Sequence, residues 1–116
     1  MAAISPSKSE KGPWHQVYKW TPVTEADTCV AVKLERPFYA YGLQVSGTFG
    51  GATVTLHGSI DGTNYAALED ADGNAVALTA AGISGSGRDM VLYLKPVTAS
   101  GSSSSVTVSV LVMFLP

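Results

Sequence analysis

Apolar and polar residues alternate along most of the chain, and this period-2 pattern predicts β-strands. Successive side chains of a strand point to opposite faces, so alternation places every second residue on one buried face. The pattern is clearest in residues 41–49, 53–60 and 106–112. In these three segments we expect the following residues to point inward: Tyr41, Leu43, Val45, Phe49, Val54, Leu56, Ile60, Val106, Val108, Val110 and Val112.

Two earlier segments follow the same alternation. The first begins at His15 and continues to Trp20. The second, residues 28–35, is predicted to be a half-buried strand with Val30, Val32 and Leu34 on its inner face and Cys29 on the opposite face. Arg36-Pro37 should end this strand, because proline cannot donate a hydrogen bond to a neighbouring strand.

Turn signals separate the predicted strands. Gly50-Gly51 predicts a tight hairpin that joins residues 41–49 to residues 53–60. Asp61-Gly62 and Asp72-Gly73 are typical turn dipeptides, because both residue types tolerate left-handed backbone conformations. About eight short strands with turns between them, and no segment of helical period, favour an antiparallel β fold.

Length and composition agree with one folded β domain. The 116 residues suffice for a single core, and 46% hydrophobic against 14% charged residues favours a folded chain over a disordered one. We predict an all-β fold, a single antiparallel β-sandwich or jelly roll, over residues 14–116. Residues 1–13 contain two prolines and no period, so we expect an extended N-terminal arm without secondary structure, either flexible or bound to a neighbour.

Charge and hydropathy narrow the classes of partner. The formal net charge is −2, and the seven Lys and Arg residues do not cluster, so the basic surface that nucleic-acid binding requires is not expected. The N-terminus lacks the apolar segment of a cleavable signal, and the apolar run from Val106 to Leu115 is too short to span a bilayer. We therefore expect a soluble protein that binds neither nucleic acid nor membrane.

Residues that could carry chemistry are few and lie in no recognised motif. Cys29 is the one cysteine, and His15 and His57 are the two histidines. The acidic segment from Glu69 to Asn74 contains oxygen ligands, but its Asp-Gly step is better explained by a turn. We expect no catalytic residue, no metal, no cofactor and no enzymatic activity. A small hydrolase would require a pocket that joins His57 or His15 to carboxylates.

Large aromatic and sulfur-containing side chains gather near the two ends of the predicted domain. Aromatic residues bury much area and are enriched at contacts between proteins. We therefore expect partner-binding anchors near the arm and in the apolar C-terminal run. For Tyr18 and Trp20, packing in the core is an equal alternative. The predicted anchors are Trp14, Tyr18, Trp20, Met113 and Phe114.

The Thr/Gly/Val-rich run from Val45 to Tyr65 resembles segments of small structural proteins of tailed bacteriophages. Asp72-Gly73-Asn74-Ala75 and the run from Tyr93 to Val97 continue the resemblance, which covers roughly Tyr41 to Val112. It rests on turn pattern and composition. The resemblance implies a β-sandwich virion protein, and among these we expect a capsid decoration or cement protein that bridges neighbouring capsomers.

This resemblance also implies partners and a location. A cement protein would bind the major capsid protein, in many copies on the capsid lattice or as a homo-oligomer, at the capsid exterior after synthesis in the host cytoplasm. The N-terminal arm would become ordered on binding. The alternative is a tail, neck or fibre component whose β-sandwich binds carbohydrate through exposed aromatic residues on a polar strand face.

Overall fold

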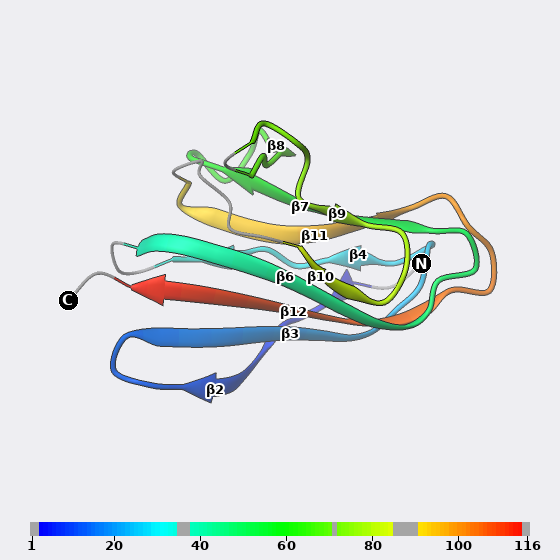
Figure 1. Cartoon of the computed structure of the whole chain (residues 1–116), viewed down its shortest axis with the longest axis horizontal. Helices are drawn as coiled ribbons and strands as arrows, with labels where there is room; N and C mark the ends of the chain where they lie inside the picture. Colours follow the sequence, from blue (N-terminus) through cyan, green and yellow to red (C-terminus); the bar gives the residue numbers. More distant parts are fainter. Residues whose placement is uncertain (1–2, 35–37, 71, 85–90, 115–116) are drawn as a thin grey trace.

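The computed structural model describes residues 3–34, 38–70, 72–84 and 91–114, and each regular element among them is a β-strand. Two larger antiparallel sheets share one core, and a small two-stranded sheet lies beside them (Figure 1). This arrangement confirms the predicted all-β sandwich. We call the sheet that contains the three longest strands the long sheet and the other larger sheet the short sheet.

The strands are ordered in each sheet as follows. The long sheet has the order β10-β6-β12-β3-β2, formed by Gly82–Ser84, Phe38–Thr48, Ser105–Phe114, His15–Val23 and Ser7–Lys11. The short sheet has the order β5-β11-β7-β8, formed by Val32–Lys33, Tyr93–Ala99, Thr53–Ser59 and Ala66–Ala67, and β9 (Ala77–Leu78) also pairs with β7. The small sheet pairs β1 (Ala3–Ile4) in parallel with β4 (Thr28–Cys29).

The core lies between the inner faces of the two larger sheets, and β12 provides its central row. The four valines at positions 106, 108, 110 and 112 are completely or almost completely buried, as their alternation predicts. They share the core cluster with Trp20 and Leu43 of the long sheet and with Leu56 and Leu94 of the short sheet. Burying a side chain of this size stabilises the fold by about 1.5–3 kcal/mol.

The Gly50-Gly51 turn joins two sheets and not two paired strands, so the predicted hairpin is wrong. β6 pairs with β12 and β10 in the long sheet, whereas β7 pairs with β11, β8 and β9 in the short sheet. Both glycines adopt positive φ, at 57° and 84°, and the carbonyl of Gly50 accepts a hydrogen bond from the amide of Ser102. Alternation showed which face of each strand is apolar. Both strands bury that face in the same core, so the pattern did not reveal which sheet each strand belongs to.

Two predicted inward residues are exposed. Val30 is 41% exposed and Cys29 is buried, because the predicted strand of residues 28–35 is divided into β4 and β5, and the irregular link between them reverses the alternation. The indole Nε1 of Trp20 donates a hydrogen bond of 2.9 Å to the carbonyl of Val30 at this link. Ile60 is 70% exposed. β7 ends at Ser59, so the strand alternation no longer directs the next side chain into the core.

Proline occupies the interior of β11 without leaving a hydrogen bond unmade. Pro96 lies opposite Leu56 in the ladder between β11 and β7. The amide of Leu56 donates to the carbonyl of Val76, and its carbonyl accepts from the amide of Leu68, both at 2.9 Å and both on the other side of β7. Leu56 therefore requires no donor from β11, and a residue that lacks an N–H is accommodated there.

The N-terminal segment forms part of the sandwich. β2 pairs with β3 at the edge of the long sheet, and β1 pairs with β4, so the expectation that residues 1–13 have no secondary structure is wrong for residues 3–4 and 7–11. Lys8 places a charge in β2, and a charged residue on an edge strand discourages further strands from pairing there. A backbone that hydrogen-bonds to a neighbouring strand needs no apolar periodicity of its own.

Substitutions at Leu56 and Ile60 should separate inner from outer positions. We expect Leu56→Ala to lower the free energy of unfolding by about 2–5 kcal/mol, because it leaves a cavity in the core. Ile60→Ala should change it by less than about 0.5 kcal/mol, because the side chain is exposed. Urea denaturation of both variants measures the difference, and equal losses would contradict the placement of Ile60.

Candidate functional site

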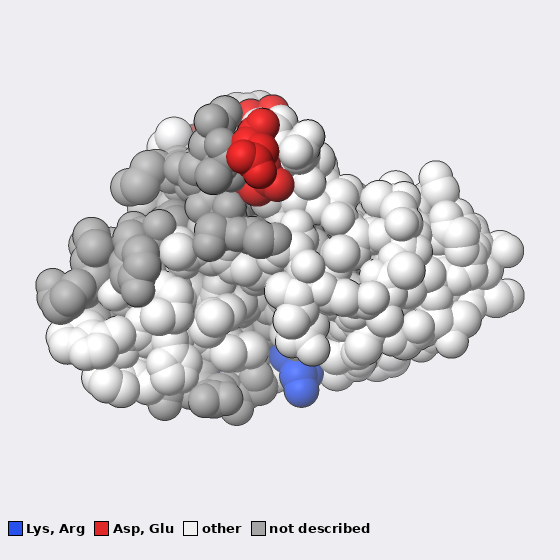
Figure 2. Space-filling model, viewed as in Figure 1, with Lys and Arg blue, Asp and Glu red and all other residues white. Residues whose placement is uncertain are grey.

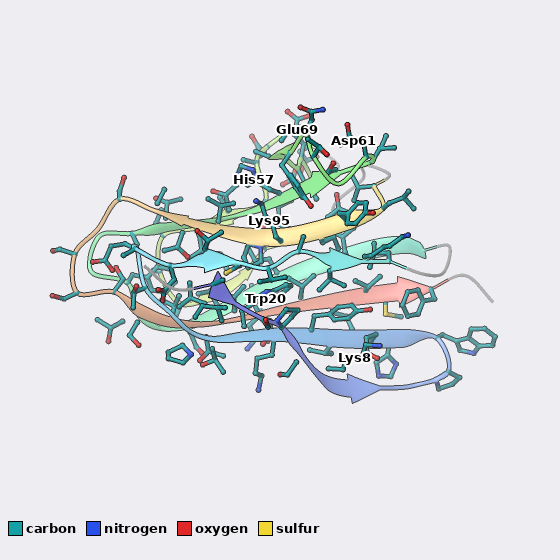
Figure 3. The ribbon with its side chains drawn as sticks, turned by 180° about the vertical axis from the view of Figure 1, so that it is seen from behind. Lys8, Trp20, His57, Asp61, Glu69 and Lys95 are labelled. Atoms are coloured by element: carbon teal, nitrogen blue, oxygen red, sulfur yellow. The ribbon has the colours of Figure 1, made fainter. Side chains whose placement is uncertain are left out.

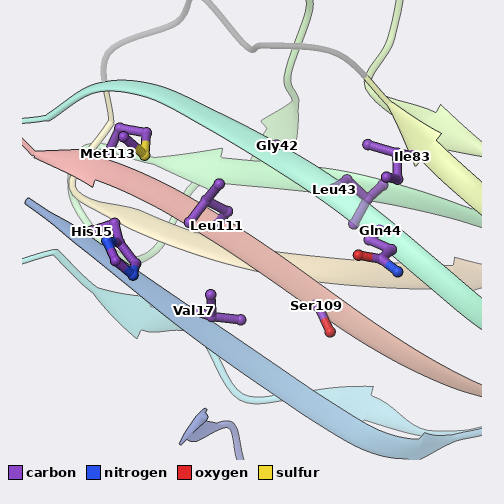
Figure 4. Close-up of a pocket in the computed structure, with 9 residues that line it drawn as sticks. All are labelled: His15, Val17, Gly42, Leu43, Gln44, Ile83, Ser109, Leu111 and Met113. Carbon is purple, nitrogen blue, oxygen red and sulfur yellow. The ribbon is translucent and has the colours of Figure 1, made fainter. Parts of the chain in front are cut away.

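A groove of about 480 Å³ lies on the outer face of the long sheet (Figure 4). The alternation that directs the valines of β12 into the core directs Ser109, Leu111 and Met113 to the opposite face, where the neighbouring strand β3 contributes His15 and Val17. Strands β6 and β10 provide the other wall. The complete lining is His15, Val17, Gly42, Leu43, Gln44, Ile83, Ser109, Leu111 and Met113.

The surface of this groove is mainly apolar. Ile83 is 74% exposed, Leu111 is also exposed, and no residue of the lining is Asp, Glu, Lys or Arg. Figure 2 shows the described part of this side of the molecule with few charged atoms, apart from an acidic group at its upper edge and a basic group at its lower edge. Exposed apolar surface bordered by polar groups is typical of a contact site for another protein.

The predicted partner-binding residues divide into two groups. Tyr18, Trp20 and Phe114 are buried in the core, so their prediction as partner contacts is corrected, and core packing holds for them. Trp14 is 47% exposed at the turn between β2 and β3, and Met113 lines the groove. The separation follows from strand alternation, since even-numbered residues of β12 and of β3 up to Trp20 face the core.

Sequence reasoning missed several residues of the groove, notably Val17 and Ile83, whereas Leu111 belongs to the apolar C-terminal run predicted to contact another chain. One signal was present, because both faces of the chain become apolar from Leu111 onward. One face of a strand at the centre of a sheet packs on the core. When the other face is also apolar, it is either covered by another molecule or left exposed to solvent. Ile83 carried no such signal, since only the pairing of β10 with β6 brings it to the groove.

The two histidines lie on different outer faces of the sandwich. His15 lines the groove of the long sheet, whereas His57 of the short sheet lies opposite Lys95 in the ladder between β7 and β11 (Figure 3). Partial burial lowers the pKa of His57 below its ordinary value of 6.5, and the charge of Lys95 lowers it further. The ammonium of Lys95 lies 4.3 Å from the centre of the Tyr65 ring, a cation–π contact.

The acidic turns use their carboxylates within the chain. Asp61 Oδ1 accepts hydrogen bonds from the backbone amides of Thr63 and Asn64, both at 2.8 Å, and from the Ser59 hydroxyl at 2.9 Å. The amides of Asn64 and Thr63, with further side-chain donors, hold the pKa of Asp61 well below its usual range. Asp70 Oδ1 likewise accepts from two amides within its own turn.

The other chemical candidate, Cys29, is a buried thiol. Burial raises its pKa to about 11, and the carboxylate of Asp27 acts in the same direction. A thiol that remains protonated at neutral pH is a weak nucleophile. Within the described ranges, no group of three or more His, Cys, Asp or Glu residues is placed to hold a metal ion. Those ranges also contain no helix long and apolar enough to cross a membrane.

Comparison with known proteins identifies the fold. No protein-family model and no curated protein matches the sequence. The SPBc2 prophage-derived protein YomS has a similar structure, with a TM-score of 0.63 and 12% identity over 90% of this chain and 98% of YomS. The PBSX exported protein XepA gives a TM-score of 0.60 and 11% identity over 88% of this chain, which spans 39% of the XepA chain.

The lowered pKa of His57 should appear in the pH dependence of stability. The unfolded chain binds this proton more readily than the folded protein, so the free energy of unfolding should decrease as pH falls from 6.5 towards the folded-state pKa. NMR titration should give a pKa for His57 below 6.5, and Lys95→Gln should raise it. Urea unfolding of His57→Gln should lack this share of the pH dependence. A pKa of 6.5 or above in the wild-type protein would contradict the placement of His57.

Proposed function

We propose that the protein is a structural component of a phage virion, and specifically a capsid decoration protein that binds the assembled head. The observation that carries the proposal is the mainly apolar groove on the outer face of the long sheet, whose lining contains no Asp, Glu, Lys or Arg. The fold supports it, because YomS is named as derived from a prophage and XepA as a protein of PBSX. The resemblance of residues 45–65 to phage structural proteins points the same way.

The proposed partner is the major capsid protein, contacted by the groove and by Trp14 near its end. Association would remove Leu111, Met113 and Ile83 from water, and burial of apolar surface is the main driving force of such contacts. A protein that binds only the assembled shell stabilises that shell by its binding free energy. Repetition over a lattice multiplies the effect, and no enzymatic step is required.

A tail, neck or fibre component that binds carbohydrate is the second candidate. It is favoured by the outer face of the short sheet, where Tyr65 and Tyr93 accompany Lys95 and His57 on neighbouring strands and the adjoining loop. Aromatic rings next to polar groups are a common surface for sugar binding. Under this alternative the short sheet, and not the groove of the long sheet, would contact the ligand.

Binding to purified heads tests the first candidate. We expect the protein to cosediment with DNA-filled heads, and Leu111→Asp to weaken this binding about tenfold or more, because a charge would be buried against an apolar surface. Ala67→Asp, which places the same charge on exposed β8 of the short sheet, is the matched control and should bind normally.

The opposite pattern would contradict the proposed contact face. Normal binding by Leu111→Asp with loss of binding by Ala67→Asp would assign the contact to the short sheet. Density-gradient separation of a native lysate, followed by mass spectrometry, tests the location independently. Recovery of the protein with tails and not with heads would overturn the decoration role in favour of the second candidate.

A further inference from the structure

The groove on the outer face of the long sheet contains a glycine at a position whose side chain would point outward. Tyr41 and Leu43, the neighbours of Gly42 in β6, are both buried, so position 42 belongs to the outer face. Gly42 lies opposite Leu111 of β12, and Leu111 lies opposite Val17 of β3. These three residues form one row across the sheet, and all three line the groove. The row has a branched apolar side chain at two positions and none at the third.

The backbone at Gly42 does not require a glycine. Gly47 of the same strand has a φ of 114°, which favours glycine, whereas Gly42 is not among the residues with positive φ. The ladder between β6 and β12 is also regular at Gly42, since its register shifts only between Met113 and Phe114. Glycine in the interior of a strand weakens it, because the flexible backbone loses more entropy and no side chain packs.

Crowding within the chain does not explain this glycine either. A Cβ atom at position 42 would lie 3.7 Å from the carbonyl oxygen of Ser84, an ordinary van der Waals contact. At Gly47, by contrast, a Cβ atom would lie 2.5 Å from the carbonyl oxygen of Ser105. A glycine in a strand that neither the backbone nor the packing requires can mark the close approach of a ligand or another chain.

The missing side chain leaves a depression between larger side chains (Figure 4). Because β6 lies between β12 and β10, Leu111 and Met113 stand on one side of Gly42 and Ile83 stands on the other. Leu111 is 39% exposed and Ile83 is 74% exposed, so the depression is open to solvent. Another molecule can therefore reach it without a change in the fold.

The lining of the groove favours an uncharged aromatic occupant. It contains no Asp, Glu, Lys or Arg, so a charged side chain would lose hydration there without gaining an opposite charge. The thioether of Met113 offers a favourable contact to an aromatic ring. Aromatic side chains bury a large area with few rotatable bonds, and they are common anchors of contacts between proteins.

We propose that an aromatic side chain of the partner protein inserts into the depression over Gly42 and anchors the contact. The ring would pack on the backbone of Gly42 and against Leu111, Met113 and Ile83. This inference rests on the proposed function for the identity of the partner, and it adds which part of the groove is occupied and by which chemical group. A side chain introduced at position 42 would occupy the same space as the ring.

The stability of the free protein tests the premise. Gly42→Ala and Gly42→Leu should leave the melting temperature unchanged or raise it, because the site has room for a side chain and glycine is unfavourable in a strand. Gly47→Ala, the control, should lower the melting temperature, because its φ is positive and the Ser105 carbonyl is close. An equal decrease for Gly42→Ala would overturn the proposal, since the fold itself would then require this glycine.

Binding to DNA-filled heads tests the occupied position. Gly42→Leu should weaken cosedimentation about tenfold or more, because the introduced side chain fills the depression. Ser46→Leu is the matched control and should bind normally, since it adds the same side chain to an exposed position of β6 outside the groove. Equal binding by wild-type protein and Gly42→Leu would overturn the inference and leave the decoration role intact.

A small probe tests the depression without a capsid. N-acetyl-phenylalaninamide is titrated into the full-length protein while backbone amide shifts are followed by NMR, with N-acetyl-alaninamide as the control. We expect saturable shifts at residues 42–44 and 109–113 with the phenylalanine probe alone, and their loss in Gly42→Leu. No saturable shift, or equal shifts in Gly42→Leu, would overturn the inference. If wild-type protein fails to bind heads, the decoration role is overturned, and this titration decides the aromatic site by itself.

Discussion

The inward row of valines on β12 is the contact on which the rest of the sandwich depends. β12 lies between β6 and β3 in the long sheet, so its four valines meet side chains from both neighbouring strands and from the short sheet across the core. Non-directional apolar burial provides the stabilisation, and the two backbone ladders of β12 fix the register of the strands beside it. The same register determines which residues of β3 and β6 reach the outer face.

The groove on the outer face of the long sheet is a consequence of this packing. Because valines 110 and 112 point inward, Leu111 and Met113 must point outward, and the central position of β12 in the long sheet places them in the middle of an outer face. A second groove, between residues 25–29 and residues 95–98, has another origin. β5 pairs with β11 only at Tyr93 and Leu94, so the following residues of β11 border residues 25–29, which end in β4.

These surfaces suggest a protein whose activity is association. The apolar groove offers area and little specificity, whereas Glu25, Asp27 and Lys95 place charges of both signs around the second groove. Contacts between proteins commonly combine both properties, with apolar burial for affinity and charged groups for orientation. The fold shared with YomS and XepA is compatible with such a role, and at 12% and 11% identity the likeness shows the fold alone.

Alternation in the sequence determined the fold class and the inward rows of β6, β7 and β12, because period 2 assigns side chains to the two faces of a strand. The Asp-Gly dipeptides determined the turns at residues 61–62 and 72–73, because glycine readily adopts positive φ. Tertiary structure alone decided that Gly50-Gly51 crosses between sheets, that residues 7–11 form an edge strand, and that Trp20 is buried while Trp14 is exposed. The physical reason is that strand pairing joins backbone groups of any sequence, so the choice of neighbour depends on packing of the whole chain and leaves no local signal.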